Sequence, residues 1–190
     1  MPYYGYGYGY GIDPLYLLVV LVSTVIGLAA QAYIKSTYGT WSNVKSDGIT
    51  GAEAARRMLD ANGCQNVGIK SIGGTLTDNY NPTDNSLYLS RDNQYGGSVA
   101  SVAVACHEAG HAAQHEQGYT MMKLRSALVP VVNLTQSAWT IVFILGVALN
   151  LAGLTTLAIW LFSFSVLFQV VTLPVEIDAS RRGVRYIQES

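Results

Sequence analysis

The segment His107-Glu108-Ala109-Gly110-His111 combines residue types and a spacing that suit metal chemistry. On a helix, residues four apart are separated by about 6 Å along the axis and about 40° around it, so both imidazoles project from one face. Two neutral imidazole nitrogens on one face suit a zinc ion. Glu108 points about 60° away from His111, from where it can reach a water activated by the metal. The pattern therefore predicts a zinc site with Glu108 as general base.

A third protein ligand is expected, because a catalytic zinc usually has three. His115 is a poor candidate, since it lies about 12 Å along a straight helix from His107. Glu176 is the better candidate, because it follows the last apolar stretch and a helical hairpin would return it to the side of the two histidines. Asp178 is the alternative ligand, or the acceptor for the outer N–H of a ligating imidazole.

The composition is that of a membrane protein with a modest soluble part. The 190 residues are 50% hydrophobic and only 12% charged, with a mean hydropathy of +0.26, whereas a typical soluble domain carries roughly 25% charged residues. The net charge of -1 argues against a nucleic-acid partner. Two cysteines are too few for a disulfide scaffold.

Three uncharged apolar stretches are long enough to cross a bilayer. They divide the chain into six main segments and one short loop. These are a Tyr/Gly-rich extracytoplasmic tail (1–14), a first span (15–34), the segment with the His-Glu motif (35–126), a second span (127–149), a third span (154–175) and a C-terminal segment with the third ligand (176–190). Residues 150–153 form the tight loop of a helical hairpin.

The orientation follows from the basic residues. All eleven Lys and Arg lie between the first and second spans or after the third, and basic residues close to spans stay on the cytoplasmic side. We therefore predict a multi-pass protein of a prokaryotic cell membrane whose candidate active site faces the cytoplasm. Lys123 and Arg125 are expected to extend toward the membrane interface.

Local signals place elements in the soluble segment. Thr50 and Glu53 form a capping-box pattern before a helix over 52–61. Strands are predicted over 67–72 and 86–90, the second of which could offer an edge to an extended peptide. Residues 78–84 are rich in turn formers. A helix over 99–117 carries the His-Glu motif, between Ser98 and Gly118.

Several ordered motifs together carry a family resemblance. They are Gly-Ile-Thr-Gly-Ala-Glu (48–53), Leu-Thr-Asp-Asn-Tyr-Asn-Pro (76–82), Leu-Ser (89–90), Ser-Val-Ala (98–100), His-Glu-Ala-Gly-His-Ala-Ala-Gln (107–114) and Leu-Pro-Val-Glu-Ile-Asp-Ala-Ser-Arg-Arg (173–182). With these motifs the chain resembles the YugP-like neutral zinc metallopeptidases of prokaryotic membranes. It is more distantly similar to HtpX-like and prenyl-protease membrane metallopeptidases.

The resemblance implies zinc and peptidase activity, with His107, His111 and Glu176 as ligands and Glu108 as base. In the distant relatives an Asp follows the ligand Glu by four residues. Here Ser180 takes that position, which leaves the partners of the ligating imidazoles undetermined.

The resulting hypothesis is a mainly α membrane protein with three transmembrane helices and a small α+β cytoplasmic zincin-like unit around the metal-bearing helix. Its function would be that of a gluzincin-like membrane-bound zinc peptidase, which binds Zn²⁺, a peptide or protein substrate and membrane lipid. The main alternative is a non-catalytic, zinc-braced membrane scaffold or adaptor that binds a partner membrane protein. A metal sensor at the cytoplasmic face is a weaker alternative.

Overall fold

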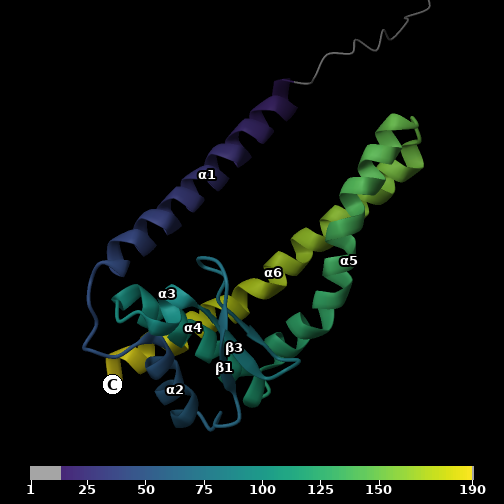
Figure 1. Ribbon diagram of the computed structural model, residues 1–190. Helices are drawn as coiled ribbons and strands as arrows, with labels where there is room; N and C mark the ends of the chain where they lie inside the picture. Colours follow the sequence, from purple (N-terminus) through teal and green to yellow (C-terminus); the bar gives the residue numbers. More distant parts are fainter. Residues whose placement is uncertain (1–13, 190) are drawn as a thin grey trace, which may run out of the picture. The chain divides into compact units, whose positions relative to one another are not determined.

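The computed structural model describes residues 14–189 (Figure 1). The Tyr/Gly-rich tail predicted for residues 1–14 therefore lies, except for Pro14, outside the described residues. The chain divides after Trp41 into two compact units, which are described separately.

The first unit contains helix α1 (Pro14–Ser42), 29 residues long. It includes the predicted first span and continues past it. Large apolar side chains along it are exposed. The hydroxyls of Ser23 and Thr24 donate to the carbonyls of Val19 and Val20, one turn earlier, at 2.7 Å each. The two side-chain hydroxyls of that turn are thus hydrogen-bonded within the helix, as polar groups in an apolar environment must be.

The second unit contains a long helical hairpin made of α5 (Thr120–Ala148) and α6 (Ala152–Glu189). The two helices lie side by side in Figure 1 and carry the stretches predicted as the second and third spans. With α1, they are the three described helices that are long and apolar enough to cross a membrane. The turn is closed by Asn150, which has a φ of 53°, a conformation that Asn tolerates better than most residues.

Helix α6 does not end where the predicted span ends. It continues past Pro174 to Glu189, so the residues after the apolar stretch lie on the same rod. This continuity positions Glu176 and the residues one turn beyond it as one helical face.

The segment between α1 and α5 contains first α2 (Gly51–Ala61), whose capping box is formed as predicted. The Thr50 hydroxyl accepts from the Glu53 backbone N–H at 3.2 Å, and the Glu53 carboxylate accepts from the Thr50 N–H at 2.8 Å. A three-stranded sheet follows, in the order β1-β3-β2. It consists of β1 (Gly68–Ile72), β2 (Asn79–Asn81) and β3 (Ser86–Ser90). β1 is parallel to β3, whereas β2 is antiparallel to it.

One expectation for this region was wrong, and another was confirmed only in part. The strand 86–90 is the centre of the sheet and not an edge, because it pairs on both sides. The stretch predicted to be turn-rich does form a turn from Pro82 onward, but it begins with β2, where Tyr80 pairs opposite Leu87. Three residues are too few for an alternating pattern, so this strand depends on its neighbour rather than on its own sequence. The short helix α3 (Arg91–Tyr95) was also not predicted.

Helix α4 (Val99–Glu116) forms the centre of the core and packs against both α2 and α6. Its N-cap Ser98 accepts from the Ser101 N–H at 3.1 Å. Small residues allow the close approach to α6. A Cβ on Gly110 would lie 2.7 Å from the carbonyl oxygen of Ala179, and one on Gly183 would lie 3.2 Å from the carbonyl carbon of Cys106. Both cysteines are buried and free, as expected for small core thiols.

Candidate metal centre

Helix α4 holds His107 and His111 one turn apart, with their ring centroids at 4.7 Å and the ring planes at 83°. The His111 side chain is 6% exposed and that of His107 is 27% exposed. The pair therefore faces a partly open region on one side and the protein core on the other.

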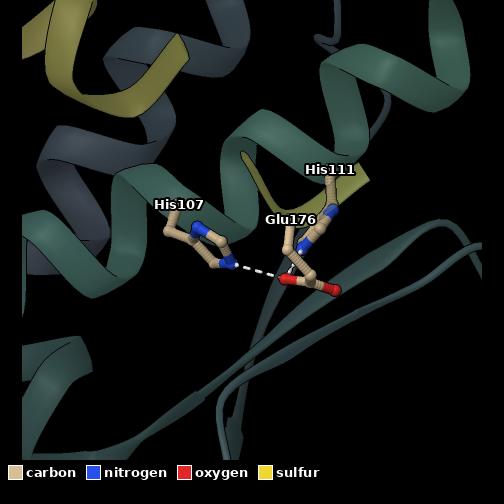
Figure 2. Close-up of side chains that lie close together, drawn as sticks. All are labelled: His107, His111 and Glu176. Carbon is tan, nitrogen blue, oxygen red and sulfur yellow. Dashed lines mark ion pairs between the residues drawn. The ribbon is translucent and has the colours of Figure 1, made fainter. Parts of the chain in front are cut away.

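Helix α6 brings Glu176 to this pair (Figure 2). Its Oε2 atom lies 3.3 Å from Nε2 of His107 and 3.3 Å from Nε2 of His111. Ligands at about 2.0–2.1 Å from a tetrahedral zinc would be about 3.3–3.4 Å apart. The two distances match the edges of such a tetrahedron, and the donor set of two imidazoles and one carboxylate suits zinc. The three residues thus form a possible metal site.

The electrostatics of the cluster favour a positive charge. Burial alone would lower the pKa of His107, but the hydrogen bond to Glu176 and the charges of Glu108 and Glu176 outweigh it, so the pKa of His107 is raised. A cation at this point, whether a proton or a metal ion, is stabilised by the same carboxylates.

The other two candidate ligands lie elsewhere. Nδ1 of His115 lies 2.8 Å from the hydroxyl of Tyr80, which in turn donates to Asn85 at 2.9 Å. The Asp178 carboxylate accepts from Gln114 at 2.8 Å and from Arg182 at 2.6 Å. Asp178 therefore reaches the site only through Gln114, and not as a direct acceptor for an imidazole.

Gln114 orients His111 through a fully used side-chain amide. Its Nε2 donates to the Val175 carbonyl and to Asp178, both at 2.8 Å, and these two acceptors take both of its hydrogens. Its Oε1, at 3.1 Å from Nδ1 of His111, must then accept from that ring nitrogen. A proton on Nδ1 leaves a lone pair on Nε2, the atom that faces Glu176. Gln114 is completely buried, so water does not replace these bonds.

Ser180 occupies the corresponding position for His107. Its Oγ lies 3.1 Å from Nδ1 of His107. The residue that stands where distant relatives have an Asp thus still contacts the outer nitrogen of a proposed ligand. Helix α6 therefore provides Glu176 to the inner nitrogens, and Ser180 one turn later to an outer nitrogen.

Glu108 follows His107 on helix α4, is not one of the three residues of the cluster, and is 8% exposed. Burial raises its pKa, partly offset by the nearby histidines. With His107 it lines a pocket of about 330 Å³, whose other walls are Leu76, Asp78, Ala103 and Val104. A buried carboxylate with a raised pKa, beside a cluster that can hold a cation, can accept and return a proton.

Arg125 is a member of the site that sequence reasoning missed. Its Nη2 lies 3.6 Å from Oε1 of Glu176, the carboxylate oxygen that does not face the histidines. Its Nε is buried without a hydrogen-bond partner. One oxygen of the Glu176 carboxylate therefore faces the two imidazoles, and the other faces the Arg125 guanidinium. No sequence signal pairs these residues, and the border position of Arg125 suggested an interfacial role instead.

Comparison with known proteins supports the family resemblance. The model of the family described as "Putative neutral zinc metallopeptidase" matches residues 16–190. The chain is 42% identical over 174 residues to "Putative membrane protease YugP" of Bacillus subtilis (strain 168), covering 90% of this chain and 77% of that protein. No solved structure matches significantly. The match over nearly the whole length shows that the chain belongs to the neutral zinc metallopeptidase family and is related to YugP.

Proposed function

We propose that this protein is a membrane-bound zinc peptidase, in which His107, His111 and Glu176 hold the metal and Glu108 is the general base. The observation that carries the proposal is the position of one Glu176 oxygen, 3.3 Å from the Nε2 atoms of both histidines. The family membership and the name of the related protease support it independently.

Each residue has a distinct task in this proposal. When bound, zinc supplies a Lewis acid that polarises a peptide carbonyl and acidifies water. Glu108 accepts a proton from the attacking water at a carboxylate oxygen and later delivers it to the leaving amine nitrogen. Burial suits Glu108 to both steps, because a raised pKa brings it closer to the pH at which it must take up and release the proton. Gln114 and Ser180 keep the two imidazoles in the orientation that ligation needs.

The test is the substitution Glu108→Gln, which keeps the shape but removes the base. The purified variant should retain one zinc per chain and lose peptide cleavage by at least about 100-fold, the typical contribution of general base catalysis. Glu116→Gln is the matched control, because Glu116 lies on the same helix and is exposed. Undiminished cleavage by the Glu108 variant would remove this residue from the mechanism.

A zinc-braced scaffold would have no open coordination position. The structure argues against it, because among the described residues only three ligand groups converge and Glu108 stands beside a pocket. A hydroxamate inhibitor separates the two functions. The inhibitor should bind the zinc-loaded peptidase tightly and the metal-free protein weakly. If the zinc is instead a closed structural brace, the inhibitor should bind neither the zinc-loaded nor the metal-free protein.

We further propose that the site faces the cytoplasm, which rests on the distribution of Lys and Arg. The exposed residue Asp47 lies in the unit that contains the site, and Gly153 lies beside the hairpin loop. A membrane-impermeant maleimide should label Gly153→Cys in intact cells, and should label Asp47→Cys only after permeabilisation. Labelling of Asp47→Cys in intact cells would reverse the orientation.

A further inference from the structure

We propose that the pocket beside Glu108 is a subsite for an apolar side chain of the substrate, next to the bond that is cleaved, with Leu76 as its specificity-determining residue. This inference rests on the proposed peptidase function and names the substrate class for that site. Two independent observations carry it: the lining of the pocket and the backbone conformation of Leu76.

The pocket connects the proposed chemistry to an apolar wall. His107 and Glu108 line one part of it, and Ala103 and Val104, one helical turn earlier, line the next. Residues four apart on a helix share a face, so a side chain that rests on Ala103 and Val104 lies directly before the metal cluster and the base. The volume of about 330 Å³ is at the lower end of the range for ligand pockets, which suits one side chain of a longer peptide.

Leu76 also lines the pocket, and it does so in a costly backbone conformation. Its φ is 56°, in the left-handed region that branched and bulky residues avoid. Leu76 is 40% exposed, so burial in the core does not explain the conformation. Such local strain persists only where the surroundings hold it, and it is concentrated at binding sites.

The loop around Leu76 is held firmly. The Thr77 hydroxyl donates to the Gly73 carbonyl at 2.9 Å, which closes the turn that contains Leu76. Asp78 fastens its other end, because its carboxylate accepts from the Ser90 backbone N–H at 2.7 Å and from the Asn93 amide at 2.8 Å. Leu76 is thus presented to the pocket by a fixed loop.

The charges at the pocket select against acidic side chains. Asp78 and Glu108 both line the pocket. An acidic side chain of the substrate would be repelled by both carboxylates. Any strongly hydrated side chain would also lose its bound water on contact with the apolar side chains of Leu76 and Val104. An uncharged apolar side chain, such as Leu or Phe, avoids both costs.

The experiment measures kcat/KM for peptides that differ only in the residues flanking the cleaved bond. The wild-type protein should prefer Leu or Phe over Asp at one of these positions by at least about 10-fold, because apolar pocket contacts are typically worth about 10–200-fold. Leu76→Asn keeps a residue that tolerates the left-handed backbone, so it should fold, bind zinc normally and lose most of this preference. Ala103→Leu should fill the pocket and shift the preference toward Ala. Val44→Asn is the control, since Val44 is an exposed apolar residue of the same unit.

A binding assay separates this inference from the peptidase function. The Glu108→Gln protein should bind the Leu peptide more tightly than the Asp peptide, and adding Leu76→Asn should abolish the difference. If the wild-type protein cleaves nothing but this binding preference is found, the peptidase function fails and the subsite stands. If cleavage occurs with equal efficiency for Leu and Asp, or if Leu76→Asn keeps the full preference, the subsite is refuted and the function stands.

Discussion

Replacing Gly110 by Ala should disconnect Glu176 from the two histidines without touching any of the three residues. A Cβ at position 110 would lie 2.7 Å from the carbonyl oxygen of Ala179, which is 0.7 Å closer than the 3.4 Å at which ordinary contact begins. The obstructing atom is backbone, so helix α6 itself must move. Ala179 lies less than one turn from Glu176, which must move with it.

Two opposing effects on the stability of the fold can be compared. Ala in place of Gly favours a helix by about 1 kcal/mol, whereas overpacking a tight contact typically costs about 1–3 kcal/mol. The free energy of unfolding of the metal-free protein should therefore fall by at most about 2 kcal/mol. The metal site tolerates a smaller displacement, because each metal–ligand distance must stay within about 0.2 Å of its usual value. Relieving the contact at Ala179 requires a shift of about 0.7 Å, which exceeds this limit. We therefore expect zinc affinity to fall by at least about 10-fold, as it does when a group that orients a metal ligand is removed.

The assay is competition for zinc with a fluorescent chelator in detergent, together with thermal unfolding of the metal-free protein. Gly153→Ala is the matched control, because Gly153 also lies on α6 and a Cβ there would meet no atom within 4 Å. It should leave zinc affinity unchanged and should not lower the unfolding temperature, because the added methyl group meets no obstruction. Wild-type zinc affinity in a folded Gly110→Ala protein would refute the argument that the close contact of α4 with α6 positions the carboxylate.

The other predictions concern the groups around the cluster. Gln114→Leu removes the acceptor for His111 and should weaken zinc binding about 10–100-fold, as measured by the same competition, whereas an unchanged affinity would mean that the tautomer is set by another group. Arg125→Ala leaves Oε1 of Glu176 free of its cation, so cobalt substituted into the site should show a changed visible spectrum, and Arg125→Lys should restore most of the original one; identical spectra in all three proteins would exclude this role. Removing zinc should lower the unfolding temperature, because a ligand at 1,000 times its Kd stabilises by about 4.1 kcal/mol, and Glu176→Gln should nearly abolish the difference between loaded and metal-free protein.

Local signals in the sequence were sufficient for most elements. The capping box of α2 was found because it depends on residues three apart, and the long apolar runs of α1, α5 and α6 are properties of composition. The common face of His107 and His111 follows from helical geometry alone. The turn-rich segment hid β2 because a three-residue strand takes its conformation from its partner β3.

The remaining contacts of the site depend on the tertiary structure. The sequence alone predicted that two imidazoles and a neighbouring carboxylate share a helix, and the order of the apolar stretches favoured Glu176 as the third ligand. Only the packing of α4 against α6 decided that Gln114 contacts Val175, 61 residues away, and that Ser180 contacts His107, 73 residues away. The same holds for Arg125, whose partner lies on another helix. Hydrogen bonds and ion pairs act over about 3–4 Å in space. Residues that are far apart in the sequence can come within this distance without leaving any periodic pattern in the sequence, so one sequence does not reveal such pairs.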